Sequence, residues 1–403
     1  MPLLIELYDE HEPMLNVLGP LMTQLEDVCY IVPETVEQSV AYARLSAFFE
    51  QMNQTVKLRF EAADPRNLPA LRGALARLAN DRPGAVVDVT GGDDLLLVAA
   101  GMALAQKSIE AIGTISPTLD AYCVYRSNGS TVRYEARLRM TVEQAICMAG
   151  GHVDGFGHFN ALSLDEETLL LSERVFRIFS ACRRNWHALV LWMQSIEEKH
   201  HVLDDRLFIR MPRRLSHGKS RICAPVATLN VLASEGLLTH FRMNERELSF
   251  RFVHAMLEEG LANAGLWLEI HVYHAAILSG AFDDVQMSVL IDWENDAEQA
   301  VRNEVDILAT AGMMQMFISC KTGAVHAEAL QEIESIARRF GSPYAVPVLI
   351  AMQPDLALCS RAANMKIALI SQDELELDAL SSRLRELVSL GRRIEQREVK
   401  HHA

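Results

Sequence analysis

Paired cysteines are absent from this sequence. Its seven cysteines are dispersed over 403 residues, and no two of them form a CxxC pair. An odd and scattered set is typical of reduced thiols, so the sequence favours a cytoplasmic protein over a disulfide framework.

Long apolar runs are absent as well. The longest one, Leu95 to Ala105, is too short to cross the roughly 30 Å hydrocarbon core of a bilayer. The first residues, Met1 to Glu6, have neither a basic start nor a cleavage site, which argues against a signal peptide. We therefore expect no membrane partner.

Positive charge is in deficit, because 38 Lys and Arg residues face 53 Asp and Glu residues, for a formal net charge of −15. A protein that wraps long nucleic acid usually carries a basic footprint. The balance therefore counts against a dedicated duplex binder. It is compatible with a small polyanion held locally, or with a nuclease whose acidic site recruits a metal ion.

The composition is that of a globular protein, with 50% hydrophobic and 23% charged residues, and the length suggests roughly two to four domains. Residues 1–150 alternate apolar strands with helices, which predicts a parallel α/β sheet with right-handed crossovers. The expected strands are Leu3–Asp9, Val28–Val32, Val56–Phe60 and Ala85–Thr90, and the expected helices are Met14–Leu25, Thr35–Gln51, Leu68–Leu78 and Leu95–Ala105.

Residues 151–260 contain one long expected helix, Leu169–Glu198, followed by a basic cluster that Pro212 and Pro225 mark as loop. The cluster consists of Arg206, Arg210, Arg213, Arg214, Lys219 and Arg221. A helix, a two-stranded wing and a second helix come next, the order of a winged helix. It either contacts nucleic acid or only packs, and acidic Glu245 and Glu247 in the wing favour packing.

Residues 261–403 begin with an expected helix, Leu266–Leu278, that carries Glu269 in its first turn. Expected strands follow at Val285–Trp293, Asn303–Leu308, Met316–Cys320, Val346–Ala351 and Lys366–Ile370, and helices at Ala327–Phe340 and Leu375–Glu398. On the same first helix, His271 and His274 could share a face as metal ligands, but packed imidazoles are the preferred interpretation.

The strands Asn303–Leu308 and Phe317–Lys321 carry the strongest chemical signal. Alternation puts Glu304 and Asp306 on one face of the first strand and Ser319 and Lys321 on one face of the second. If these strands pair, a carboxylate and an ammonium meet at one edge of a sheet, which suits a metal-dependent phosphodiesterase. The alternative is a hairpin with solvated charges.

A second signal is the segment from Val86 to Asp94, in which an apolar strand runs into Thr90, Gly91 and Gly92 before a helix opens. Glycines let backbone N–H groups approach a phosphate at a helix N-terminus. Asp93 and Asp94 would repel a phosphate, yet they could cap the helix or accept hydrogen bonds from a base or ribose. The alternative is an ordinary tight strand–helix turn.

Taken together, these segments resemble the CARF-domain nucleases that accompany type III CRISPR systems, over nearly the whole chain. The resemblance rests on Leu4–Asp9 with Asn16–Val17, on Asp88–Gly92, on Gly265–Glu269, on Asn303–Asp306 and on Ile318–Gly323. It implies an α/β chain with an N-terminal Rossmann-like CARF domain (1–150), a linker and winged-helix-like domain (151–260) and a restriction-endonuclease-like PD-(D/E)xK domain (261–403).

The resemblance also implies a homodimer that binds a cyclic oligoadenylate, typically cyclic tetra-adenylate. Binding switches on a Mn²⁺- or Mg²⁺-dependent nuclease that cuts single-stranded RNA or DNA or nicks duplex DNA. The implied ligand-binding residues are Tyr8, Asp9, Thr90, Gly91, Gly92 and Asp93. The implied catalytic residues are Glu269, Glu304, Asp306, Ser319 and Lys321, with Glu269 and Asp306 as metal ligands.

Two positions depart from the family pattern. Relatives often have Thr-Lys where this chain has Asp93-Asp94, and the position two before the catalytic lysine is usually acidic or Gln, whereas here it is Ser319. The second departure keeps open a non-catalytic regulator that senses a nucleotide and binds DNA. A third alternative is a resolvase-like repair nuclease without small-molecule control.

Overall fold

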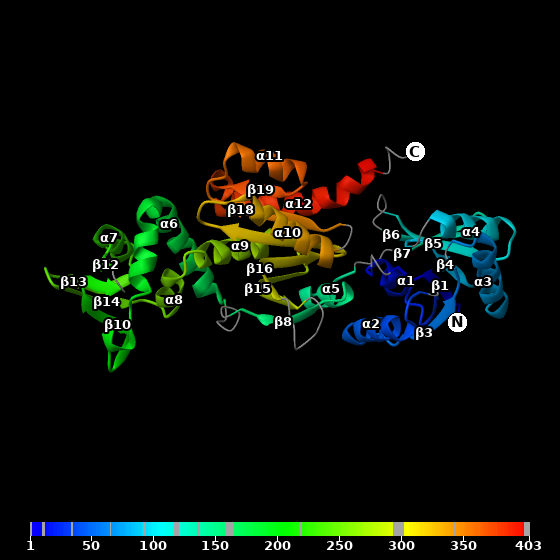
Figure 1. Ribbon diagram of the computed structural model, residues 1–403, viewed down its shortest axis with the longest axis horizontal. Coiled ribbons are helices and arrows are strands. Elements are labelled where there is room, and N and C mark those ends of the chain that lie inside the picture. Colours follow the sequence, from blue (N-terminus) through cyan, green and yellow to red (C-terminus); the bar gives the residue numbers. More distant parts are fainter. Residues whose placement is uncertain are drawn as a thin grey trace.

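The computed structural model describes residues 2–9, 13–33, 35–64, 66–91, 94–116, 121–134, 138–157, 164–217, 220–292, 302–341 and 344–398. Three groups of elements follow one another along an elongated molecule (Figure 1). The C-terminal sheet lies in the middle, between the N-terminal sheet at one end and the sheet of residues 201–252 at the other. None of the helices in the described ranges is both long and apolar enough to cross a membrane.

The N-terminal sheet has seven strands in the order β3-β2-β1-β4-β5-β6-β7. Its strands are β1 (Leu4–Leu7), β2 (Asp27–Val32), β3 (Lys57–Ala62), β4 (Val86–Asp88), β5 (Ala111–Ser116), β6 (Ala121–Arg126) and β7 (Thr131–Tyr134). Strands β1 to β5 run parallel, and β6 and β7 are antiparallel additions. The strand order reverses between β1 and β4, which is where ligands bind in sheets of this kind.

Helices cover both faces of this sheet. They are α1 (Leu15–Thr23), α2 (Gln38–Gln51), α3 (Leu68–Asp81) and α4 (Asp94–Ala105). Alternate strand residues face opposite ways. Leu4 and Val28 pack with residues of α1 and α2, whereas Ile5 packs with residues of α3 and α4. The predicted α/β alternation is confirmed, although the sequence interpretation omitted β5, a short strand interrupted by Gly113.

The region after residue 164 begins with the long helix α6 (Glu166–Met193). It packs against a four-stranded sheet of order β13-β14-β10-β9 and a separate two-stranded ribbon of β11 and β12. The elements are η2 (Glu198–His200), β9 (His201–Val202), β10 (Asp205–Pro212), β11 (Arg214–His217), β12 (Ser220–Cys223), α7 (Val226–Ser234), β13 (Leu238–Met243), β14 (Glu247–Phe252) and α8 (Met256–Ala262).

The basic cluster was predicted as loop, and that prediction is wrong. Arg210 lies within β10, and Arg214 and Arg221 lie on the paired strands β11 and β12. In β10 the apolar residues Ile209 and Met211 are buried, while Arg210 between them is exposed. This period of two is a strand pattern that the surrounding prolines and charges obscured.

The C-terminal sheet has six strands in the order β19-β18-β17-β16-β15-β8. Its elements are α5 (Val142–Met148), β8 (His152–Phe156), α9 (Leu266–Ser279), β15 (Asp284–Asp292), β16 (Arg302–Ala311), β17 (Met314–Lys321), α10 (Ala327–Phe340), β18 (Val346–Ala351), α11 (Leu356–Asn364), β19 (Ala368–Ser371), η3 (Gln372–Glu374) and α12 (Leu377–Glu398). Helices α9 and α12 pack with one apolar face of the sheet, and α10 and α11 with the other. The edge strand β8 comes from far earlier in the chain and pairs with β15.

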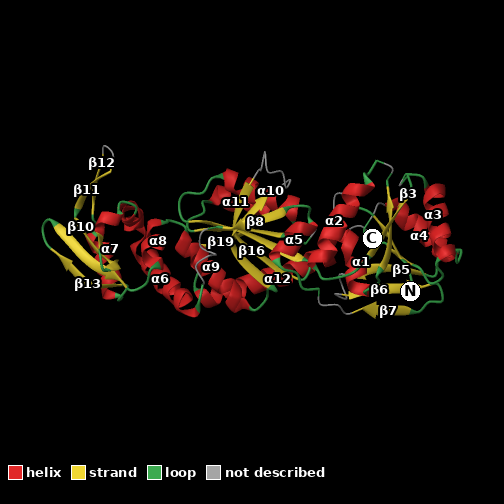
Figure 2. Ribbon diagram, turned by 90° about the horizontal axis from the view of Figure 1, so that it is seen from below, coloured by secondary structure: helices red, strands yellow, loops and turns green. Residues whose placement is uncertain are grey.

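Both Figures 1 and 2 show a mixed α/β protein with several sheets, which confirms the α/β part of the predicted fold class. The seven cysteines are all free, as expected from their spacing. Helix α11 was not expected from the sequence. It is only nine residues long, and its buried residues, Leu358 and Ala362, are too few to give a clear apolar period.

Candidate active site

The carboxylate of Asp306 forms the centre of the C-terminal site. Strands β16 and β17 pair antiparallel with Ile307 opposite Ile318, which brings Asp306 beside the end of β17. Asp306 Oδ2 accepts hydrogen bonds from Ser319 Oγ at 3.1 Å and from the Cys320 backbone N–H at 2.6 Å, and it lies 3.7 Å from Lys321 Nζ. All these contacts use Oδ2, so Oδ1 has no hydrogen bond within the described residues.

The site is accessible as well as ordered. The side chain of Lys321 is 39% exposed and that of Asp306 is 18% exposed, so water reaches both groups. The predicted meeting of a carboxylate and an ammonium at a sheet edge is therefore present. The alternative prediction, a hairpin whose charges contact only water, is wrong, because Asp306 contacts Ser319, Cys320 and Lys321.

A local irregularity in β15 accompanies Asp306. The register pairs Met287 with Ile307 and Val289 with Val305, which leaves Ser288 opposite Asp306, and Ser288 has a φ of 49°. Ile307 packs in the apolar cluster that includes α9, whereas Val305 packs in the cluster on the other side of the sheet.

Strict alternation, which predicted one common face for Glu304 and Asp306, therefore fails between Val305 and Ile307. Glu304 is exposed, and a Cβ atom placed on Gly157 would lie 3.3 Å from its Oε1. Asp306 is instead partly buried beside β17. The left-handed backbone of Ser288 marks the point at which the two strands change course.

Glu269 reaches the site from the first turn of α9, a helix that packs against β15 and β16. Burial first, and then the negative charges of Asp306 and Glu304, raise the pKa of the Glu269 carboxyl to about 8. Lys321 acts in the opposite sense. The helix carboxylate, the strand aspartate and the lysine are therefore neighbours, as the sequence predicted.

The donor set suits a hard divalent cation. Mg²⁺ is typically held by one or two carboxylates together with oxygens of a substrate phosphate. Asp306 Oδ1 accepts no hydrogen bond from the described residues, and a cation would offset the negative charges of Asp306 and Glu304 that add to burial in raising the pKa of Glu269. Within the described ranges no three His, Cys, Asp or Glu residues form a complete metal cage, so the substrate would complete the coordination.

Neighbouring polar residues have structural roles. Cys320 is buried, and burial followed by the charges of Asp306 and Glu269 raises the pKa of its thiol well above the usual range, which excludes an activated nucleophile. His271 stacks on Phe176 with ring centroids 3.8 Å apart, and its Nε2 lies 2.8 Å from the Leu375 carbonyl oxygen. Both His271 and His274 are buried, so the prediction of packed imidazoles is confirmed, and this burial lowers the pKa of both rings.

The N-terminal sheet brings a second set of predicted residues together. Tyr8 and Asp9 follow β1, Thr90 and Gly91 follow β4, and β1 and β4 are parallel neighbours. A Cβ atom on Gly91 would lie 3.1 Å from Leu15 Cβ and 3.9 Å from Asp9 Cβ, so the two loops are in contact. Gly92 and Asp93 lie outside the described residues.

Hydrogen bonds fix both loops. Asn16 on α1 accepts a bond from the Asp9 N–H and donates one to the Asp9 carbonyl, each at 2.7 Å. Thr90 Oγ1 accepts a bond from the Ile115 N–H at 3.2 Å. Tyr8 is largely buried and packs edge-on against Tyr30.

Two buried acids beneath this crevice were not predicted to have a role. Glu6 on β1 and Asp88 on β4 are 2% and 3% exposed. A Cβ atom on Gly19 of α1 would lie 2.3 Å from both Glu6 Oε1 and Asp88 Oδ2, so these oxygens are near neighbours. Asp88 Oδ1 accepts a 2.6 Å hydrogen bond from the Thr90 N–H, which ties the buried pair to the crevice. Their only sequence signal was an acid within each apolar strand.

Burial raises the pKa of both acids. For Glu6 the shift is upward from burial first and from the charge of Asp88 second. For Asp88 the pKa rises to about 6, where burial outweighs the hydrogen bonds that favour the charged form. The pair therefore shares at least one proton near neutral pH.

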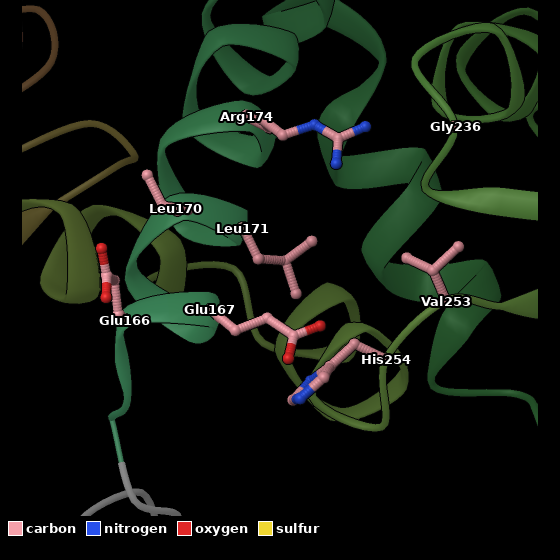
Figure 3. Close-up of a pocket in the computed structure, with 8 residues that line it drawn as sticks. All are labelled: Glu166, Glu167, Leu170, Leu171, Arg174, Gly236, Val253 and His254. Atoms are coloured by element: carbon pink, nitrogen blue, oxygen red, sulfur yellow. The ribbon is translucent and has the colours of Figure 1, made fainter.

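A separate pocket of about 540 Å³ lies between the start of α6 and the end of β14. Figure 3 shows Leu171 and Val253 along its sides, with Glu167 pointing toward His254 and Arg174 on the far side. It contains none of the residues of either predicted site.

Comparisons with known proteins agree with this geometry. A family model described as "Card1-like, endonuclease domain" matches residues 258–390. The chain is similar to the solved structure of protein VC1899 from Vibrio cholerae, with 18% identity and a TM-score of 0.71, covering 97% of this chain and 98% of that one. Among curated proteins, none matches this sequence.

The chain is also similar to Can2 from Sulfobacillus thermosulfidooxidans, whose structure was solved in complex with cyclic tetra-adenylate. That match has 14% identity and a TM-score of 0.67, and it covers 97% of this chain and 99% of Can2. At such identities the two structures establish a shared fold, while the family model shows that residues 258–390 resemble an endonuclease domain. The resemblance to CARF-associated nucleases is therefore confirmed, and it lies in the whole fold and in the match of residues 258–390 to the Card1-like family.

Proposed function

We propose that this protein is a metal-dependent nuclease of type III CRISPR defence that a cyclic oligoadenylate activates. The observation that carries the proposal is the contact of Asp306 with Lys321, with Glu269 beside them, inside the Card1-like endonuclease domain. Catalysis of phosphodiester hydrolysis needs an anchored cation and positive charge near the scissile phosphate. These residues supply both functions.

In this proposal, Asp306 and Glu269 would hold Mn²⁺ or Mg²⁺, and the ion would supply Lewis-acid polarisation of the phosphate and a lowered pKa for a bound water. Lys321 Nζ orients the attacking water and stabilises the charge that develops on the phosphate oxygens. Ser319 and the Cys320 N–H fix the Asp306 carboxylate through Oδ2 and leave Oδ1 for the cation. Exposed Glu304 adds negative charge at the rim.

The activator is assigned to the crevice between the ends of β1 and β4. Support comes from the reversal of strand order there and from the similar fold of Can2, which was solved with cyclic tetra-adenylate. We propose that residues 1–150 form a CARF-like sensor, 151–260 a linker and winged-helix-like region whose strand β8 joins the C-terminal sheet, and 261–403 a PD-(D/E)xK nuclease. Two copies would share one ring, which biases the nuclease pair toward its active arrangement.

The deciding experiment compares wild type with Lys321→Ala on labelled single-stranded RNA and DNA, with Mn²⁺, with and without cyclic tetra-adenylate. Wild type should cut only with the activator, and Lys321→Ala should lose at least about 100-fold in rate. Lys57→Ala, which removes an exposed lysine on β3, serves as the control. Cyclic tetra-adenylate should raise the melting temperature of all three proteins equally. Equal cleavage by wild type and Lys321→Ala would refute the assignment.

A non-catalytic regulator is the second candidate, and Ser319 is the observation that favours it. Its hydroxyl bonds to Asp306 and supplies no charge for a cation. A regulator would bind cyclic tetra-adenylate, as judged by the thermal shift, but would leave every labelled strand intact at all metal concentrations.

A further inference from the structure

The outer face of the sheet formed by β10, β14 and β13 is basic. One face of this sheet is buried, with Ile209, Leu248 and Phe250 in the core beside α6. The residues between them face the other way. The register aligns them in two rows across the sheet, Arg210–Ser249–Arg242 and Phe208–Arg251–Thr239, and exposed Arg206 extends β10 beyond the second row.

The arginines of this face are only partly neutralised. Arg251 pairs with Asp205 at 2.7 Å, and Arg210 pairs with Glu247 at 3.3 Å. Arg206 and Arg242 are exposed and have no acidic partner among the described residues. On a chain of net charge −15, this face therefore keeps an excess of positive charge.

An aromatic ring sits among these charges. Phe208 is only partly buried, and it is not one of the side chains packed against the core of this region. Its strand neighbours on the same face are Arg206 and Arg210, and Arg251 lies opposite it on β14. A phenyl ring held outward between guanidinium groups offers a flat apolar surface next to anion-binding groups.

We propose that this face binds a single strand of nucleic acid. Proteins that hold single strands without sequence preference combine arginines for the phosphates with aromatic side chains on which bases stack. Arg206, Arg210 and Arg242 would contact the backbone, and Phe208 would stack on a base. Arginine suits this role because its planar guanidinium binds phosphate oxygens in pairs.

The surface is remote from the candidate active site. Figure 2 places β10 and β13 at one end of the molecule, with α6, α7 and α8 between them and the six-stranded sheet that carries Asp306. It is therefore a strand-holding surface and not a second cutting site. As a substrate surface it rests on the proposed nuclease function, but strand binding is measurable without cleavage.

The test measures the affinity of the full chain for a fluorescent 20-nucleotide oligouridine by anisotropy, in EDTA and over a range of salt concentrations. Arg206→Gln combined with Arg242→Gln should weaken binding about tenfold at low salt. The slope of log K against log salt should fall by about 1.4, because each lost phosphate contact contributes about 0.7. Phe208→Ala should weaken binding about tenfold with little change in slope.

The matched control is Arg126→Gln combined with Arg184→Gln, which removes the same charge from two exposed positions on β6 and α6. The control should bind like wild type. If it weakens binding as much as the double variant of the sheet, or if neither does, the proposal is overturned. Equal affinity for duplex and single strand, with no effect of Phe208→Ala, also overturns it.

Failure of the proposed nuclease function gives a different result. Lys321→Ala should retain strand binding in EDTA even though it cannot cut. If wild type never cleaves but the Arg206 and Arg242 variant still loses binding, the surface stands and the nuclease assignment falls.

Discussion

The molecule contains two sets of neighbouring carboxylates with opposite surroundings. Glu6 and Asp88 lie under α1 in the N-terminal sheet, buried, and neither forms an ion pair in the described part of the chain. In the second set, Asp306 is 18% exposed and lies 3.7 Å from Lys321, and Glu269 beside it is partly buried. The first pair resolves its repulsion by sharing a proton, whereas in the second set the nearby Lys321 acts to lower the raised pKa of Glu269.

This difference separates acids that only pack in the core (structural acids) from acids that are available to a cation and substrate (chemical acids). A carboxylate buried without a cation is costly to ionise, so its pKa rises and it serves as a neutral packing group. A carboxylate that is partly exposed and paired is available to a divalent cation and to substrate. Acidic residues in apolar strands therefore indicate function only when a cation and solvent access accompany them.

The largest expected effect comes from substitution of Asp306, the chemical acid of this comparison. Asp306→Asn keeps the shape of the side chain but removes the negative charge that would hold a cation, so the rate of cleavage should fall about 1,000-fold. Asp88→Asn makes the same chemical change in the buried pair of the N-terminal sheet and should leave cleavage within about twofold of wild type, because an amide oxygen can still accept the Thr90 N–H bond. Initial rates on a labelled single strand measure both. Similar losses in both variants would contradict the division into structural and chemical acids.

The next effect concerns the packing of the buried pair. Gly19→Ala places a methyl group 2.3 Å from oxygens of Glu6 and Asp88, which forces α1 away from the sheet. We expect a loss of about 3 kcal/mol in the stability of the N-terminal sheet, measured by thermal unfolding. In the control Gly101→Ala, the methyl group on α4 meets no atom within 4 Å and should stabilise the helix by about 0.5 kcal/mol. A neutral Gly19→Ala would show that the acids can move apart freely.

A smaller effect appears in the pH dependence of stability. The pKa of Asp88 in the folded chain, about 6, lies above its ordinary value of 3.8, so the folded state binds the proton more tightly than the unfolded state. The stabilisation is complete below about pH 4 and is lost as the pH rises to about 6, by about 2 kcal/mol. Glu6 shifts in the same direction.

Melting temperatures of wild type and Asp88→Asn between pH 4 and pH 8 measure this dependence. The variant should melt higher than wild type at pH 7 and show a flatter profile, since its amide has no charge to bury. A wild-type melting temperature that climbs between pH 4 and pH 6 would contradict the raised pKa, because it would mean that the unfolded state binds more protons.

The smallest expected effect on cleavage comes from Ser319, which hydrogen-bonds to the chemical acid Asp306. Ser319→Ala removes the hydroxyl that donates to Asp306 Oδ2 but keeps the Cys320 N–H bond, so cleavage should fall about fivefold, the value of one modest hydrogen bond. Ser360→Ala on α11, whose hydroxyl bonds only to the Leu356 carbonyl, is the control. A 100-fold loss in Ser319→Ala would instead make Ser319 a direct ligand of the cation.

Much of the chemistry was visible in the order of residues. A helix carboxylate, a strand aspartate and a strand lysine predicted the neighbourhood of Glu269, Asp306 and Lys321, because adjacent strands of one sheet leave few alternatives for where their ends meet. The roles of these residues stay predictions. The sequence interpretation missed the partial exposure of Phe208 and the strand that carries Arg206 and Arg210. The nearby prolines and charges suggested a loop and hid the alternation of buried and exposed residues.

Long-range pairings were beyond local patterns. Strand β8 pairs with β15 across more than a hundred residues, and the contact of Glu6 with Asp88 depends on which strands become neighbours. The irregularity at Ser288 also arises from pairing, because no residue preference for Ser predicts a φ of 49°.

The sequence by itself determined the alternation of strands and helices in residues 1–150, the absence of disulfides and the residue types of the candidate site. Hydrophobic period and residue chemistry are local properties, and they survive folding unchanged. Only the tertiary structure decided which acids keep their protons and which arginines share a surface. Those properties depend on burial and on neighbours that the chain brings together from distant positions.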